Sequence, residues 1–223
     1  MSHQTASDPR RARTEQGPRP ARFLLQARHL ACARGAKTVC SGQNLTLQPG
    51  GILWLRGRNG SGKTSLLRVL AGLASPEAGA VERAPALRTL FIGHANALKE
   101  DLSVMENLRF LAILNGLPVA IERLQVALRF WGLWSRRHAP ARTLSQGLRR
   151  RVALSRLSLA DEVQLWLLDE PLDALDDEGV ATLYALLGQQ QARGGAGLLT
   201  SHVPLQSARL QLFEHWLSQA PQA

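Results

Sequence analysis

One eight-residue segment constrains the fold of this chain more than any other. Residues 57–64, Gly-Arg-Asn-Gly-Ser-Gly-Lys-Thr, fit the spacing G-x-x-x-x-G-K-[ST]. The segment follows a short apolar run at residues 52–56 and overlaps the start of residues 63–73, where the leucines have helical spacing. A strand, a glycine-rich turn and a helix in this order predict the phosphate-binding loop of an α/β protein.

Each residue type in this loop suits the binding of nucleotide phosphates. The glycines let successive backbone N–H groups converge on phosphate oxygens. Lys63 adds a positive charge at the β- and γ-phosphates, and the Thr64 hydroxyl is a candidate ligand of Mg²⁺. The candidate nucleotide-binding residues of the loop are Gly57, Arg58, Asn59, Gly60, Ser61, Gly62, Lys63, Thr64 and Ser65.

Two neighbouring carboxylates follow a second buried strand, which we predict at residues 163–168. Ligands bind beyond the carboxyl ends of strands in open α/β sheets, which is where Asp169 and Glu170 fall. We expect Asp169 to hold Mg²⁺ through water and Glu170 to orient and deprotonate an attacking water. An Asp-Glu pair alone is also common at solvated strand ends, but the preceding phosphate-binding loop favours the catalytic interpretation.

The apolar pattern predicts three structural parts in one domain at residues 23–217. Residues 23–32 and 45–47 are typical of antiparallel strands in a β-rich N-terminal subdomain. The buried-type strands of a parallel α/β sheet are predicted at residues 52–56, 87–92, 163–168 and 197–200. Residues 102–159 hold three helical segments and no strand candidate, which predicts a helical insert.

Aromatic side chains in the insert have two interpretations. Ile121, Leu124, Leu128 and Trp131 form one apolar stripe at helical spacing. Because such spacing usually marks a core, we expect Phe130, Trp131 and Trp134 to be buried. The alternative is that one or more of them is an exposed anchor for a partner.

The chain ends and its charge carry weaker information. Residues 1–22 have few apolar side chains and several prolines and arginines, so we expect a disordered basic tail, and residues 218–223 a short C-terminal tail. The tail lacks the apolar centre of a secretory signal, and no apolar run is long enough to span a bilayer. The net charge of +10 comes almost wholly from arginine and is poor support for a nucleic-acid partner, which we do not expect.

Cys32 and Cys40 fit neither a disulfide framework nor a zinc site, so we expect reduced, semi-buried thiols.

Residues 144–154, Leu-Ser-Gln-Gly-Leu-Arg-Arg-Arg-Val-Ala-Leu, resemble the signature of ABC ATPases, commonly L-S-G-G-Q followed by such a helix. The order of the phosphate-binding loop, this segment, Asp169-Glu170, Asp176 and His202 is also that of the family. The resemblance implies an α/β P-loop ATPase of ABC type, with a mixed sheet, a β-rich N-terminal subdomain and a helical insert. It also implies a homodimer in which each ATP, with Mg²⁺, lies between the P-loop of one copy and the signature of the other.

The resemblance assigns roles to residues outside the P-loop. Ser145 and the Gly147 backbone would contact the γ-phosphate across the dimer interface, His202 would contact it within its own copy, and Asp176 would couple the two sites. Gln146 and Leu148 depart from the common signature, so the ribose contact of the usual glutamine is expected to be missing. His94 falls where the family has a glutamine that contacts Mg²⁺, which adds it to Thr64 and Asp169 as a candidate metal ligand. Arg34 falls near the usual adenine-stacking aromatic.

Three segments are similar to the haem exporter ATPase of cytochrome c biogenesis: residues 92–94, 151–157 and 169–176. This resemblance implies a peripheral subunit at the cytoplasmic face of a bacterial inner membrane, bound to integral membrane permease subunits and linked through them to a periplasmic haem chaperone. Its ATP hydrolysis would serve haem export or release of that chaperone. The alternatives are an ABC ATPase for another substrate, a soluble ABC protein acting on nucleic acid, and a regulatory subunit with negligible turnover. The absence of a tandem domain or coiled-coil insertion disfavours the second, and Glu170 disfavours the third.

Overall fold

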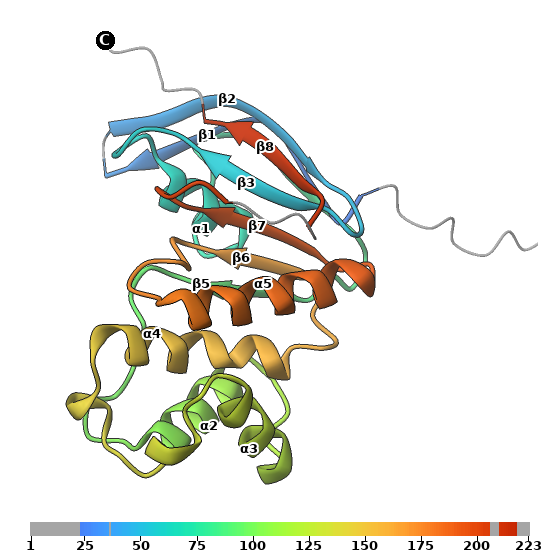
Figure 1. Cartoon of the computed structure of the whole chain (residues 1–223). Helices are drawn as coiled ribbons and strands as arrows, with labels where there is room; N and C mark the ends of the chain where they lie inside the picture. Colours follow the sequence, from blue (N-terminus) through green and yellow to red (C-terminus); the bar gives the residue numbers. More distant parts are fainter. Residues whose placement is uncertain (1–22, 36, 206–209, 218–223) are drawn as a thin grey trace, which may run out of the picture.

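The computed structural model describes residues 23–35, 37–205 and 210–217 (Figure 1). The predicted tails at residues 1–22 and 218–223 lie outside this range. In chain order the elements are β1 (Leu25–Arg34), β2 (Lys37–Leu47), β3 (Ile52–Arg56), α1 (Lys63–Leu70), β4 (Ala78–Arg83), β5 (Thr89–Ile92), α2 (Val104–Leu114), α3 (Ile121–Phe130), η1 (Trp134–Arg136), η2 (Ala141–Thr143), α4 (Gln146–Leu154), η3 (Ser155–Leu159), β6 (Leu165–Leu168), α5 (Asp177–Ala192), β7 (Ala196–Thr200) and β8 (Leu212–Trp216).

The described strands form two separate sheets. One is antiparallel with the order β2-β1-β4, and the other is parallel with the order β5-β6-β7-β3-β8. The β-rich N-terminal part and the parallel strands are both present as predicted. Among the described residues they form two separate sheets and no single mixed sheet, because β1 pairs with β2 and β4 alone. Strands β4 and β8 were not predicted because their apolar runs are short and broken. Strand β4 has small residues followed by two charged ones, and Glu214 and His215 interrupt the apolar residues of β8.

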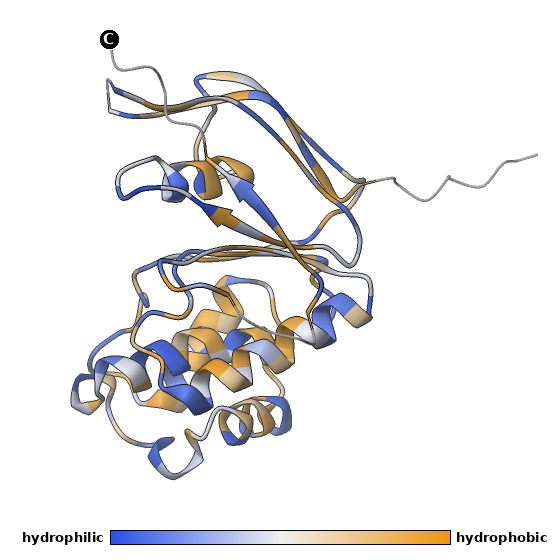
Figure 2. Ribbon diagram, turned by 45° about the horizontal axis from the view of Figure 1, so that its top comes forward, coloured by the Kyte–Doolittle hydropathy of each residue, from blue (hydrophilic) through white to orange (hydrophobic). Residues whose placement is uncertain are grey.

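Both faces of the parallel sheet are covered, and alternate residues of its strands enter different cores. On β6, Leu165 and Leu167 pack with α1 and the antiparallel sheet. Trp166 and Leu168 point to the opposite face and pack with α5 and the helical insert. Figure 1 shows α5 and the insert on one side of this sheet, and Figure 2 shows the apolar faces of these helices turned inward. This double cover explains why a central strand such as β6 is apolar throughout and not alternating.

The helical insert lies where the sequence predicted it, but not all its apolar residues are buried. Leu124, Leu128 and Trp131 belong to the core. Ile121 is 49% exposed because, at 100° per residue, it lies on the edge of the apolar stripe, about 80° from Trp131. The core prediction is also wrong for Phe130, which is 42% exposed, since adjacent helical residues point about 100° apart.

The other aromatic of the insert, Trp134, is half-buried rather than part of the core. The guanidinium groups of Arg129 and Arg137 lie 3.9 and 4.2 Å from its ring centroid. Trp134 is therefore covered by arginine side chains, which are cation–π partners of the indole.

The two cysteines are free and lie opposite each other on β1 and β2. Both are fully buried in the core between the antiparallel sheet and α1, so the expectation of semi-buried thiols is wrong. The antiparallel register places them on the inner face of this sheet, which α1 covers. Across the described part of the chain, no helix combines the length and apolar character needed to span a bilayer.

Candidate functional site

The glycine-rich loop joins the carboxyl end of β3 to the start of α1, as predicted. Gly62 is the residue that caps α1, with φ of 96°, and a Cβ atom there would lie 2.8 Å from the Val39 side chain. A residue with a side chain is therefore excluded by both backbone conformation and space. The first N–H groups of α1 remain free of side-chain caps, which leaves them available to an anion.

Two polar side chains of this loop are prepared for a ligand. The Lys63 ammonium donates to the Gly57 carbonyl over 2.9 Å, which holds the side chain across the loop. The Ser61 hydroxyl is buried and has no hydrogen-bond partner among the described residues. Because a buried hydroxyl without a partner is unfavourable, this atom fits a loop completed by a bound group.

A chain of hydrogen bonds connects the loop to the acidic strand end. The Thr64 hydroxyl donates to Asp169 Oδ2 over 2.8 Å, and the Thr200 hydroxyl donates to Asp169 Oδ1 over 2.9 Å. Thr200 in turn accepts from the backbone N–H of Glu170 over 2.7 Å. The oxygens of Thr64 and Asp169 thus face each other at one edge of the parallel sheet, and such hard oxygen donors suit Mg²⁺.

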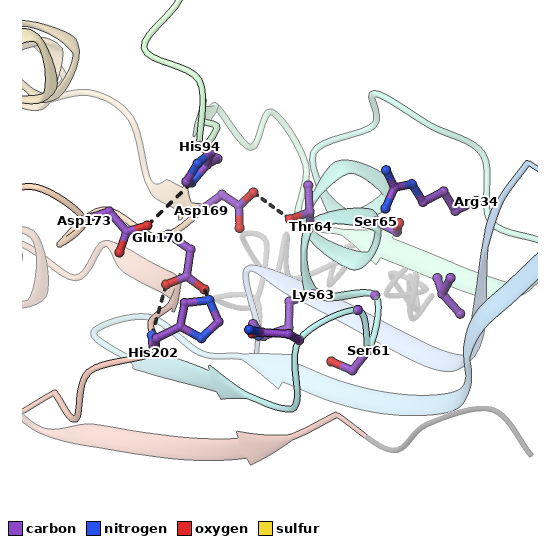
Figure 3. Close-up of a pocket in the computed structure, with 14 residues that line it drawn as sticks. Arg34, Ser61, Lys63, Thr64, Ser65, His94, Asp169, Glu170, Asp173 and His202 are labelled. Atoms are coloured by element: carbon purple, nitrogen blue, oxygen red, sulfur yellow. Dashed lines mark hydrogen bonds and ion pairs between the residues drawn. The ribbon is translucent and has the colours of Figure 1, made fainter. Parts of the chain in front are cut away.

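His202 makes two contacts with the Glu170 side chain, and the backbone of Glu170 has an unusual conformation. His202 Nε2 lies 3.3 Å from Glu170 Oε1, and the His202 backbone N–H donates to Glu170 Oε2 over 3.1 Å (Figure 3). Burial raises the pKa of Glu170, and the neighbouring His202 opposes that rise. The backbone of Glu170 has a φ of 48°, a sparsely populated conformation for a residue other than glycine.

The loop, the two carboxylates and His202 line one hollow of about 290 Å³. His94 also lines it, with Nδ1 3.6 Å from Asp173 Oδ2, and so does Arg34 at the end of β1. In Figure 3 Arg34 lies on the opposite side of the loop from Glu170 and His202. The complete lining is Arg34, Val39, Asn59, Gly60, Ser61, Gly62, Lys63, Thr64, Ser65, His94, Asp169, Glu170, Asp173 and His202.

The signature residues do not take part in this hollow. Ser145 caps α4, where its hydroxyl accepts from the Leu148 N–H over 3.3 Å. A Cβ atom at Gly147 would lie 2.6 Å from the Ala174 carbonyl oxygen, so close backbone packing requires glycine there. Asp176 caps α5 and pairs with Arg151, whose hydrogen bond lowers the pKa of Asp176. Within one chain, Ser145, Gly147 and Asp176 therefore lie apart from the residues that line the P-loop hollow.

Sequence reasoning missed two residues of this region. Thr200 ends a predicted buried strand, and a hydroxyl at that point beside Asp169 could have been suspected. Arg150 is buried and donates to carbonyl groups of both Asp169 and Glu170. Its one sequence signal is helical spacing, because Arg150 lies one turn before the buried Leu154 on α4.

Residues 40–173 match the ABC transporter family. The chain belongs to the ABC transporter family. It is an ABC-type ATPase, which binds ATP and couples its hydrolysis to transport, and this confirms the predicted fold class and the resemblance.

Named relatives place this ABC ATPase more narrowly. The cytochrome c biogenesis ATP-binding export protein CcmA of Cupriavidus necator is 44% identical over 196 residues, covering 83% of this chain and 86% of the relative. Proteins of the same name from Methylococcus capsulatus and Nitrosospira multiformis are 46% and 40% identical, covering 80% and 84% of this chain and 90% and 98% of their own. The chain belongs with these export proteins.

Solved structures agree with the fold. An ATP-binding subunit of an ABC transporter superposes with a TM-score of 0.71 at 27% identity, covering 81% of this chain and 80% of that one. A Pyrococcus furiosus protein described as a putative ABC transporter ATP-binding protein superposes with a TM-score of 0.74 at 24% identity, covering 86% and 96%. The second likeness supports the fold alone.

Proposed function

We propose that this chain is the MgATP-hydrolysing subunit of a complex that exports haem, or releases its periplasmic chaperone, in c-type cytochrome biogenesis. The observation that carries the ATPase part is the convergence of the P-loop, Asp169, Glu170 and His202 on one hollow. The cytochrome c biogenesis names of relatives that are 40–46% identical support the cellular role.

The polar residues of the hollow divide several tasks in this proposal. The P-loop N–H groups and Lys63 bind the phosphates, with Ser61 as a further donor. Thr64 and Asp169 hold Mg²⁺, which neutralises phosphate charge when bound, and His94 lies near enough to line the same space. Glu170 orients and deprotonates the attacking water, and its raised pKa makes it a stronger base than an exposed glutamate. His202 positions Glu170 and contacts the γ-phosphate.

The proposal needs a second copy of the chain. Ser145 and Gly147 do not line the hollow of their own copy. A homodimer arranged head to tail places the signature of one copy over the P-loop of the other, so that the positive N-terminal end of α4 faces the γ-phosphate. In this arrangement Asp176 lies between the two ATP sites and couples them.

Membrane subunits are the other proposed partners. Apolar side chains are exposed at the C-terminal end of α2 and on α3, including Leu114 and Val126. Exposed apolar side chains of this kind suit a protein partner. We propose that the insert docks on integral membrane permease subunits at the cytoplasmic face of a bacterial inner membrane.

Co-purification from native membranes tests the cellular role. The tagged chain is purified with its bound partners, which are identified by mass spectrometry, and ATP hydrolysis of the complex is compared with that of a Glu170→Gln complex. The proposal expects membrane proteins of c-type cytochrome maturation together with Glu170-dependent hydrolysis. Glu170-dependent hydrolysis with an unrelated permease would retain the ATPase and refute the haem assignment.

A further inference from the structure

Arg150 is a buried cation directly behind the candidate site. It lies in the middle of α4, the helix that begins at the signature residue Ser145, and it is 3% exposed. Among the described residues it makes no ion pair with a carboxylate, and its side chain donates to oxygens of two loops. Because desolvation of a buried charge is costly, these hydrogen bonds must be well formed to offset that cost.

One end of the guanidinium holds the turn that carries the catalytic carboxylates. Arg150 Nη2 donates to the carbonyls of Asp169 and Glu170, each over 2.8 Å. Nε makes a longer contact of 3.4 Å to the Pro171 carbonyl. Three consecutive carbonyls of this turn therefore face one side chain.

The other end of the same guanidinium holds the loop after β5. Arg150 Nη1 lies 3.0 Å from the Gly93 carbonyl oxygen, 3.3 Å from that of His94 and 3.2 Å from Asn96 Oδ1. This loop carries His94, which lines the hollow. One guanidinium group thus bonds to both the loop after β5, here called the His94 loop, and the turn at residues 169–171, here called the Glu170 turn.

The Glu170 turn needs such support because its backbone conformation is unfavourable. The positive φ of Glu170 persists only where surrounding contacts determine it. Thr200 binds the N–H side of this residue and Arg150 binds its carbonyl. Together they fix the peptide units on both sides of the Glu170 side chain.

We propose that Arg150 is a positioning residue for ATP hydrolysis, which holds the Glu170 turn and the His94 loop in one fixed relation by donating to both. The inference rests on the proposed role of Glu170 and deepens it. Arg150 touches neither nucleotide nor water in this proposal, since it lies behind the hollow and does not line it. Arg150 acts through Glu170, so substitution of Arg150 lowers the turnover rate more than it changes the affinity for ATP.

Arginine is the one side chain suited to this task. Its five donors lie in a rigid plane, and only such a fork reaches carbonyls on two loops at once. Burial lowers the pKa of Arg150, while the negative charges of Asp173, Asp169 and Glu170 oppose that change. A lysine would keep the charge but present a single point donor, which can serve one loop and not both.

The test compares the same substitution at two buried arginines. Arg150→Lys removes the fork behind the site. Arg156→Lys is the matched control, because Arg156 is also buried but donates to the Ala153 carbonyl and to Asn115, away from the hollow. Each purified protein is measured for melting temperature, for affinity for a fluorescent ATP analogue and for kcat of ATP hydrolysis.

We expect kcat of Arg150→Lys to fall about 100-fold, the usual cost of misplacing a catalytic group by about 1 Å. Its nucleotide affinity should stay within about threefold of wild type. Arg156→Lys should lose comparable thermal stability and keep kcat within about threefold. A kcat near wild type in Arg150→Lys, or an equal loss in both variants, would overturn the proposal.

A milder variant keeps the test decisive if Arg150→Lys does not fold. Asn96→Ala removes one acceptor of the guanidinium and leaves the buried cation in place. The loss of one such hydrogen bond should lower kcat about fivefold at unchanged nucleotide affinity, and an unchanged kcat would overturn the proposal. A wild-type protein without Glu170-dependent hydrolysis would instead refute the proposed function, and the role of Arg150 with it.

Discussion

The substitution Thr200→Val tests the chain of hydrogen bonds that connects the phosphate-binding loop to Asp169 and Glu170. Valine has nearly the shape of threonine, so the substitution leaves packing in place and removes the hydroxyl. Thr200 is fully buried, and its hydroxyl donates to Asp169 Oδ1 and accepts from the Glu170 N–H. The change therefore leaves a buried N–H group without its partner and deprives a buried carboxylate of one donor.

The expected cost follows from these two losses. Each buried polar group without a partner costs about 1–3 kcal/mol, and the added methyl group returns about 0.8 kcal/mol. With both losses counted and the methyl group subtracted, the free energy of unfolding should fall by about 1–5 kcal/mol. Turnover should fall by about tenfold or more, because the Glu170 backbone is released on one side.

Urea denaturation at neutral pH measures the stability change, with the m-value checked for constancy. Thr182→Val is the matched control, since the Thr182 hydroxyl donates to the Glu178 carbonyl in a solvent-exposed contact on α5. It should change stability by no more than about 0.5 kcal/mol. A Thr200→Val protein as stable and as active as the control would refute this account of the Asp169–Glu170 turn.

Two further predictions concern the insert and the antiparallel sheet. Trp131→Ala should lower the free energy of unfolding by about 3–5 kcal/mol. Phe130 is the exposed neighbour of Trp131, and Phe130→Ala should change this free energy by no more than about 0.5 kcal/mol. Urea denaturation of the two variants measures both changes. Cys32 and Cys40 should resist alkylation by iodoacetamide in the native protein and react on unfolding, because both are buried. Mass spectrometry detects the adducts, and rapid native labelling would contradict the burial described for these thiols.

The sequence was sufficient for the parts of the fold that depend on local pattern. The P-loop could be predicted because its glycines, Lys63 and Thr64 lie at characteristic spacing within residues 57–64, between a strand and a helix. The Asp169-Glu170 pair could be placed at the same sheet edge because parallel strands end together. These features depend on spacing along the chain, which the sequence contains directly.

Contacts between distant segments could not be predicted in the same way. The hydrogen bonds of Arg150 join residues that are 19 to 57 positions apart in the sequence, and no pattern within α4 points to their partners. Strand β8 joins the parallel sheet beside β3, although its own residues are largely exposed. Phe130 shows a related limit, because helical spacing identifies an apolar face but not where that face ends.

The most direct test of the account is ATP hydrolysis by Glu170→Gln, measured in a single turnover alongside wild type. Glu162→Gln is the control, because this carboxylate is 86% exposed and lies outside the hollow. The account predicts that Glu170→Gln binds ATP with about wild-type affinity and hydrolyses it at least about 100-fold more slowly, while the control remains fully active. Hydrolysis by Glu170→Gln at the wild-type rate would contradict the assignment of Glu170 as the general base.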